Sequence, residues 1–138
     1  TNQAGIGEGV FSEKEYSAFK EHYDRIFYKE KIRITETLHC PHTKEMNCNC
    51  RKPSPYFIGM LSEKYHVDIK TSFVIGDHPG DVKMGELAGC KSIYLLSGHG
   101  EKHLGEIDRE SVYIAENLYK AALYISSLKQ DNSLKSDN

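Results

Sequence analysis

The chain has 138 residues, enough for one domain with a buried core. Its 18 basic and 20 acidic residues leave a formal net charge of −2, which argues against nucleic acid as the main partner. No apolar run approaches the ~18 residues of a membrane span, so no membrane partner is expected. Four cysteines without a recognisable signal peptide favour a reducing compartment and a cytoplasmic protein.

The first third of the chain contains a glycine-rich segment and a strong helical pattern. Thr1 to Gly9 holds three glycines, which is typical of a loop whose backbone N–H groups approach a ligand. Ser12 and Glu15 match a capping box, which predicts a helix from Glu13 to about Tyr28. Six residues of this stretch fall on one helical face and predict a core-facing stripe. They are Phe11, Tyr16, Phe19, Tyr23, Ile26 and Phe27.

The remaining segments alternate between strand and helix patterns and predict an α/β fold with a mostly parallel sheet. We expect this domain to cover residues 1–129, followed by a polar, disordered tail over residues 130–138. The expected strands are Lys31–Thr37, Ser72–Ile75, Ser92–Leu96 and Val112–Ile114, and the expected helices are Pro55–His66, Val82–Ala88, Glu101–Ile107 and Glu116–Lys129.

A dense group of metal-ligating residues lies in the middle of the chain, with three cysteines and one histidine within eleven residues. Cys40 and His42 form one i, i+2 pair, and Cys48 and Cys50 form a second. Structural Zn²⁺ takes four sulfur or nitrogen ligands in a tetrahedral arrangement, and two short pairs joined by a loop can supply them. We therefore predict a closed, structural zinc site.

Two alternatives to this ligand set stay open. The cysteines could form a disulfide, although that would suit a secreted chain better. His39 could replace His42 as a ligand, although in extended backbone its side chain would point to the opposite side. Arg51 and Lys52 follow the last cysteine directly, so a rigid metal loop would present a planar guanidinium and an ammonium to an anion.

Acidic residues follow the next predicted strand, in the motif from Gly76 to Asp81. Ligands of parallel α/β sheets bind off the carboxyl ends of the strands, where this motif, the first nine residues, Arg51–Lys52 and Ser97–Gly100 are expected. Carboxylates hold Mg²⁺, and neighbouring cations neutralise phosphate oxygens. A helix N-cap and a first-turn acid are equally good explanations for Asp77 and Asp81 at this stage.

Together these motifs resemble the zinc-bearing branch of the haloacid-dehalogenase-like (HAD) phosphatases, from Thr1 to about Gly100. The resemblance implies a Rossmann-like HAD core with helices on both faces and a small zinc loop. It implies catalytic roles for Lys52 and Asp77, with Asp77 as a Mg²⁺ ligand and Asp81 as an indirect one. The residues that it assigns to phosphate or substrate binding are Thr1, Asn2, Gln3, Ala4, Arg51, Lys52 and His78.

The chain departs from the family pattern at the group that attacks phosphorus. Family members carry an Asp-x-Asp at the end of the first strand, and the 138 residues contain no such motif. The chain starts where the second family motif starts, so we expect it to lack the first strand and most of the second. His78 stands where heptose-specific members carry Lys. By itself, the chain is expected to be inactive.

The resemblance implies the C-terminal part of a Mg²⁺-dependent phosphatase that hydrolyses a sugar bisphosphate, similar to heptose 1,7-bisphosphate, through an aspartyl-phosphate. Two alternatives stay open. The substrate could be the amino-alcohol phosphate histidinol phosphate, because the branch shares its motifs between both activities. The chain could also be a non-catalytic, zinc-stabilised module that binds phosphorylated ligands. A monomer is expected for the intact protein.

Overall fold

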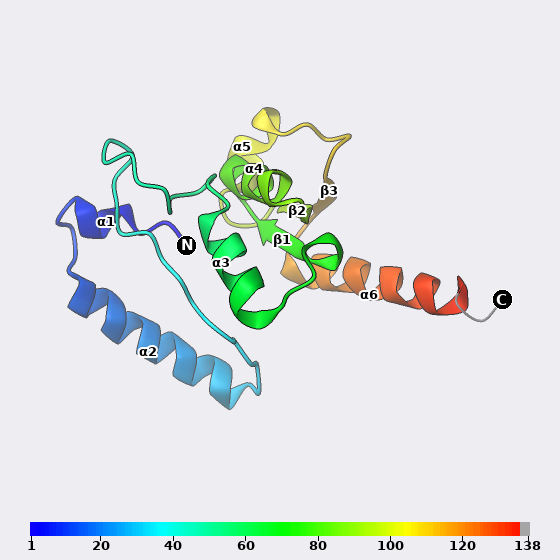
Figure 1. Ribbon diagram of the computed structural model, residues 1–138, viewed down its shortest axis with the longest axis horizontal. Helices are drawn as coiled ribbons and strands as arrows, with labels where there is room; N and C mark the ends of the chain where they lie inside the picture. The colour runs from blue at the N-terminus through cyan, green and yellow to red at the C-terminus, as the bar shows by residue number, and fades with distance from the viewer. Residues whose placement is uncertain (136–138) are drawn as a thin grey trace. The chain divides into compact units, whose positions relative to one another are not determined.

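The computed structural model describes residues 1–135, and the chain folds as two compact units (Figure 1). The first unit is Thr1–Lys52, and the second starts at Pro53. No helix among residues 1–135 combines the length and the apolar composition that a membrane crossing requires.

The first unit contains a single helical turn, α1 (Ala4–Gly7), and one long helix, α2 (Glu13–Lys29). The predicted capping box starts α2. Ser12 Oγ accepts the N–H of Glu15 at 3.2 Å, and Glu15 Oε2 accepts the N–H of Ser12 at 2.7 Å. These two bonds satisfy donors that the first helical turn leaves without partners. The prediction of this helix is confirmed, whereas α1 occupies part of the expected loop.

The aromatic face of α2 is much more exposed than its pattern predicts. Tyr16 is buried beneath the ring of His39, with ring centroids 4.3 Å apart. By contrast, Phe19, Tyr23 and Ile26 are 62%, 41% and 47% exposed. A helix face is buried only where another layer packs on it, and in residues 1–52 that packing is largely confined to Tyr16. The prediction of a core stripe was therefore wrong for three of its six residues, whereas Tyr16 is buried and Phe11 and Phe27 are half-buried.

The predicted strand Lys31–Thr37 is absent. In residues 31–39 the backbone forms no ladder, and the first unit has a single isolated parallel bridge between Asn2 and Cys40. Alternation of apolar and charged residues describes a chain that could be a strand, but a strand forms only beside a partner. Within the first unit the bridge at Cys40 is where such a partner exists.

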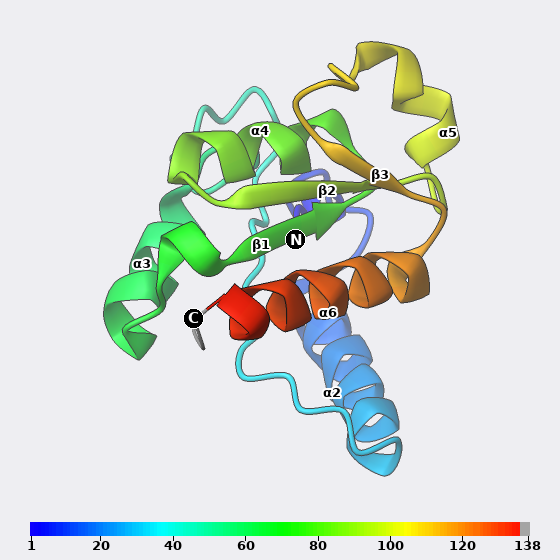
Figure 2. The ribbon, with the colours of Figure 1, turned by 90° about the vertical axis from the view of Figure 1, so that its right-hand side faces the viewer.

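The second unit is an α/β layer structure around a three-stranded sheet of order β1-β2-β3, with both pairs parallel (Figure 2). This architecture confirms the predicted α/β fold with a parallel sheet. Its elements are α3 (Tyr56–Tyr65), η1 (Ile69–Thr71), β1 (Phe73–Gly76), α4 (Pro79–Ala88), β2 (Lys91–Leu95), α5 (Gly100–His103), η2 (Leu104–Glu106), β3 (Tyr113–Ala115) and α6 (Leu118–Lys135).

Helices cover both faces of this sheet, and the strand alternation decides which residues meet which helix. Figure 2 shows α4 on one side and α6 on the other. On the α4 side, Gly85 packs so closely on Val74 and Ser92 that it leaves no room for a Cβ. On the α6 side, Ile93 and Ala121 lie in the main core cluster. Each face of the sheet is therefore packed against one of these helices.

Several helix boundaries differ from the sequence prediction. The expected helix Glu101–Ile107 is divided into α5 (Gly100–His103) and the 3₁₀ turn η2 (Leu104–Glu106). Helix α4 starts at Pro79, three residues before the predicted Val82, because His78 and Asp81 form its capping box. Helix α6 continues to Lys135, where the sequence predicts an end near Lys129. Residues 136–138 of the expected disordered tail lie outside the described residues.

Candidate functional site

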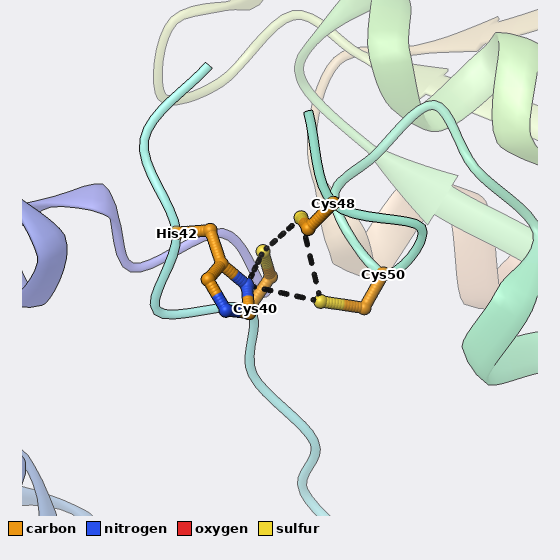
Figure 3. A group of neighbouring side chains, drawn as sticks. All are labelled: Cys40, His42, Cys48 and Cys50. Atoms are coloured by element: carbon orange, nitrogen blue, oxygen red, sulfur yellow. Dashed lines mark hydrogen bonds between the residues drawn. The ribbon is translucent and has the colours of Figure 1, made fainter. Parts of the chain in front are cut away.

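Four side chains of the first unit converge as a metal-binding group: Cys40, His42, Cys48 and Cys50 (Figure 3). Their donor atoms all lie within 4.8 Å of one another. Sulfur–sulfur distances are 3.5 Å for the Cys40–Cys48 pair and 3.6 Å for the Cys48–Cys50 pair. His42 Nδ1 lies 3.6 Å from Cys40 Sγ and 3.4 Å from Cys50 Sγ. Tetrahedral zinc with ordinary bond lengths separates its donors by about 3.4–3.8 Å, so this set fits the ion.

The cluster shifts the pKa values of Cys48 and Cys50 in opposite directions. Burial by itself would raise the pKa of Cys48, but hydrogen bonds from the backbone of Cys50 and from the neighbouring thiols lower it to about 6. Burial and the thiols of Cys40 and Cys48 raise the pKa of Cys50 to about 12. Once one thiolate forms, its charge opposes the next, and a divalent cation relieves that repulsion. The donor chemistry therefore suits a bound zinc.

The structure settles both alternatives for the ligand set. His39 Nε2 lies 3.1 Å from Glu13 Oε2, and its ring packs on Tyr16, so it points away from the cysteines. All four cysteines are free, and none forms a disulfide. Cys90 lies outside the cluster, in the second unit.

The two cations predicted to meet an anion are tied to this cluster. Arg51 Nη1 donates to the backbone oxygen of His42 at 3.0 Å. The backbone N–H of Lys52 donates to Asn2 Oδ1 at 3.0 Å. Both cationic residues are half-buried. The structure thus brings Asn2, Arg51 and Lys52 together beside the cysteine loop. The sequence analysis expected the two segments at one edge, but it gave no signal for the hydrogen bond between Asn2 and Lys52.

Two glycine amides of the glycine-rich segment bond to the protein instead of facing a ligand. Gly7 donates its N–H to the oxygen of Pro41 at 2.9 Å, and Gly9 donates to Ile6 at 3.1 Å. A Cβ on Gly7 would lie 2.7 Å from the Pro41 oxygen, so glycine is needed for this close approach. For these two amides, the expectation of a ligand-facing loop was wrong. Thr1 to Ala4 lie beside Cys40 through the Asn2–Cys40 bridge.

The second unit carries the acidic part of the candidate site at the carboxyl ends of β1 and β2. Asp77 follows β1, and its Oδ2 accepts the N–H of His99 at 2.8 Å. Gly98 (φ +69°) brings the following loop so close that a Cβ there would collide with the same oxygen. The prediction that the loops after these two strands meet at one edge is confirmed. Asp77 is not the N-cap of α4, because His78 has that position.

Asp81 has a structural role that sequence reasoning offered as an alternative. It is 6% exposed, and its Oδ2 accepts the N–H of His78 at 3.2 Å as part of the capping box. Its carboxylate also packs against Gly76, where a Cβ would not fit. First-turn acids stabilise the helix dipole as well as the free N–H groups. The fold therefore accounts for Asp81 without a metal.

His78 is held by a short chain of polar residues that sequence reasoning missed. Its Nδ1 accepts the N–H of Gly80 at 3.0 Å, which places the ring proton on Nε2. The ring of His103 lies beside it, with centroids 4.9 Å apart, and His103 Nδ1 lies 2.7 Å from Glu106 Oε1. A helix N-cap usually draws Ser, Thr, Asp or Asn, so the histidine gave no sequence signal for this role.

The candidate residues thus form two groups, one in each unit. Lys52 belongs to the first unit and Asp77 to the second. The proximity of the two side chains across the units stays a prediction.

The local geometry of both groups can now be set beside known proteins. A sequence pattern described as HAD-hydrolase-like matches residues 49–121, which is just over half of the chain. The chain belongs to the HAD-hydrolase-like family. The family match begins between Cys48 and Cys50 and includes Lys52 and Asp77. It confirms the predicted family and, with the parallel sheet, the predicted fold class.

Several relatives of this HAD-like chain are named as heptose-1,7-bisphosphate 7-phosphatases. The chain is 35% identical over 127 residues to D-glycero-alpha-D-manno-heptose-1,7-bisphosphate 7-phosphatase of Photorhabdus laumondii. The match covers 86% of this chain and 67% of that protein. The chain is 40% identical over 77 residues to a probable D-glycero-D-manno-heptose-1,7-bisphosphate 7-phosphatase of Thermoplasma volcanium, covering 56% and 53%.

Among solved structures, a D,D-heptose 1,7-bisphosphate phosphatase from B. bronchiseptica, complexed with magnesium and phosphate, matches with a TM-score of 0.84. Its sequence identity is 26%, with 95% of this chain and 72% of that chain covered. The HAD-like chain thus spans between about half and three quarters of the length of these three proteins.

Proposed function

We propose that this HAD-like chain forms the phosphate-gripping and metal-binding part of a Mg²⁺-dependent phosphatase that acts on a sugar bisphosphate similar to heptose 1,7-bisphosphate. The observation that carries this proposal is the cation pair Arg51–Lys52 held on a four-donor cluster, in a chain with the fold of a phosphatase solved with magnesium and phosphate. Such phosphatases belong to the phosphoric monoester hydrolases. The names of the relatives favour a heptose bisphosphate over histidinol phosphate.

The proposed roles follow the chemistry of the side chains. Lys52, with Thr1 and the neighbouring amides, would neutralise and hold phosphate oxygens, and the Arg51 fork would contact the sugar end of the substrate. Asp77 would hold Mg²⁺ through a hard carboxylate oxygen, while the His99 N–H keeps that carboxylate in place. When bound, Mg²⁺ supplies charge neutralisation at the phosphoryl group. His78 would contact the substrate beside Asp77.

Zinc is proposed as a structural ion held by Cys40, His42, Cys48 and Cys50. A closed set of four protein ligands leaves no position for substrate or water. The ion would therefore contribute to folding the loop that carries Arg51 and Lys52, and not to the chemistry itself. Free thiols ligating zinc suit the cytoplasm, where we place the protein as a monomer.

Turnover by the proposed mechanism requires an aspartate nucleophile, and the 138 residues contain no Asp-x-Asp. We therefore expect the 138-residue chain alone to release no phosphate from heptose 1,7-bisphosphate. A chimera that restores a family segment in front of Thr1, from the first strand with its Asp-x-Asp through the second strand, is expected to hydrolyse it. The measurement is phosphate release over a panel that includes histidinol phosphate, with and without Mg²⁺.

Matched variants of the chimera test the assigned roles. Lys52→Ala and Asp77→Asn are each expected to lower kcat/KM by about 100-fold or more, because each removes charge stabilisation of the transferred phosphoryl group. Lys83→Ala and Asp108→Asn, both at exposed positions of the second unit, are the controls and should change kcat/KM little. Equal loss in the controls would contradict the assigned roles.

A non-catalytic, phosphate-binding module is the second candidate, because residues 1–138 contain no Asp-x-Asp. It requires that both the chain and the chimera bind phosphate without hydrolysing any member of the panel. Hydrolysis by the 138-residue chain, after contaminating phosphatases are excluded, would contradict the binding module and show that the nucleophile of the first candidate has been misplaced.

A further inference from the structure

Asn2 connects two parts of the first unit that are 50 residues apart in sequence. Its Oδ1 accepts the backbone N–H of Lys52 at 3.0 Å, and the contact is partly buried. Because the backbone N–H can only donate, the oxygen of the carboxamide faces Lys52 and the NH₂ group faces away. The oxygen of Asn2 is therefore committed to the backbone of Lys52.

The backbone of Asn2 is in turn fixed to a metal-ligating residue. The N–H of Cys40 donates to the oxygen of Thr1 at 2.8 Å, and the N–H of Gln3 donates to the oxygen of Cys40 at 2.7 Å. These two bonds form the parallel bridge on either side of Asn2. Cys40 itself is fully buried. Asn2 is thus held against the least exposed ligand of the cluster.

Lys52 is held from a second direction by the chain itself. It lies two residues after Cys50, another member of the cluster, and the intervening Arg51 donates to the oxygen of His42 at 3.0 Å. Lys52 is therefore connected to the cluster twice, through Asn2 to Cys40 and through the chain to Cys50. A long lysine side chain loses much conformational freedom when it binds an anion, and a fixed backbone reduces part of that cost.

We propose that Asn2 is a positioning residue. Its side-chain oxygen forms a latch, defined as the hydrogen bond that ties the backbone of Lys52 to the segment paired with Cys40. The latch fixes the backbone position from which the Lys52 ammonium reaches a phosphate group. The assignment rests on the proposed function, because the role of Lys52 toward phosphate belongs to it. Asn2 acts through Lys52. Asn2 thereby links the position of Lys52 at the anion site to the ordered metal loop.

Amide hydrogen exchange in the zinc-loaded, 138-residue chain tests the latch directly. Asn2→Ala is expected to speed exchange of the Lys52 amide about fivefold or more, the factor that one net hydrogen bond represents. Zinc content should stay near one per chain, and the Cys40 amide should stay protected. Asn2→Asp keeps an oxygen acceptor and is expected to restore protection at Lys52. Met46→Ala, at an exposed position of the same loop, is the control.

Two outcomes of the exchange experiment would overturn the latch. Unchanged exchange at Lys52 in Asn2→Ala would show that the hydrogen bond contributes nothing. Equal loss of protection at Cys40 and Lys52 in both Asn2 variants, with loss of zinc, would show that Asn2 merely supports the fold of the unit.

A titration with inorganic phosphate in the presence of Mg²⁺ separates the latch from the proposed function. Lys52→Ala and Asn2→Ala are both expected to weaken phosphate binding, by about tenfold and about fivefold. If Lys52→Ala binds phosphate like the wild type, the proposed role of Lys52 fails, whatever the exchange data show. If Lys52→Ala weakens binding but Asn2→Ala does not, the positioning role is overturned and the proposed function stands.

Discussion

Different kinds of interaction stabilise the interior of each of the two units of this HAD-like chain. In residues 1–52, the buried residues are Tyr16 and Cys40, and the loop from Cys40 to Lys52 is ordered by converging donors and by backbone bonds. The second unit has an apolar core between its sheet and helix α6, with Ile93, Ala115 and Ala121 almost fully buried. The comparison teaches that one chain can contain a unit ordered by converging donor atoms and a second unit ordered by apolar packing.

Cys48→Ser is expected to have the largest effect, and its effect should be confined to the first unit. The hydroxyl is a poor zinc ligand, so the chain should lose its one zinc and the loop that carries Arg51 and Lys52 should unfold. Metal analysis with residue-resolved amide exchange measures both. Loss of protection in β1 and β2 as well would break the distinction between the two units.

Ile93→Ala is the converse change. It removes a buried branched side chain, 1% exposed, from the centre of the second unit and should cost about 2–5 kcal/mol of unfolding free energy. Chemical denaturation followed by tyrosine fluorescence gives the value, and zinc content should stay at one per chain. A variant that loses zinc along with this stability would contradict independent units.

Ser12→Ala tests the local stability of α2 with a smaller expected effect, about 1 kcal/mol for the loss of a helix cap. The N–H of Ser12 and then its hydroxyl lower the pKa of Glu15 in the folded chain. The stabilisation from this shift is present above the ordinary Glu pKa and is lost as pH falls through the lowered one. Thermal unfolding between pH 3 and 6 should show a weaker acid dependence in Ser12→Ala than in the wild type.

The smallest expected effect is a change of chemical shift without a change of stability. His78 should carry its proton on Nε2, because Nδ1 accepts from Gly80, whereas His103 should carry a proton on Nδ1 beside Glu106. Two-bond ¹H–¹⁵N spectra at neutral pH distinguish the two patterns, and Glu106→Gln should perturb His103 first. Identical patterns in the two rings would contradict the polar chain described here.

The sequence predicted the local features of this molecule better than the distant ones. The cysteine cluster was predictable because its four ligands lie within eleven residues and zinc constrains their types. Helix α2 was predictable from its capping box, but the exposure of Phe19 was not, because a stripe does not reveal what packs on it. The Asn2–Lys52 contact spans 50 residues and uses a backbone donor, which leaves no pattern in the sequence.

The loop after β2 shows that the family resemblance and the structure explain different aspects of Asp77. The resemblance pointed to Asp77, and the structure explains how the carboxylate is held, through the His99 amide and the absence of a side chain at Gly98. Neither residue carries a family motif. Their contribution is visible only once the ends of two parallel strands are placed side by side.

Gly98 makes the chain sensitive to substitution at a residue that has no charge and no reactive atom. At φ +69°, and with the Asp77 oxygen where a Cβ would lie, any side chain at residue 98 would be strained and would displace the Asp77 carboxylate. An inherited change there would push the acid aside and mimic the loss of the acid itself. Substitutions at Gly98 should therefore be tolerated as poorly as substitutions at a functional side chain.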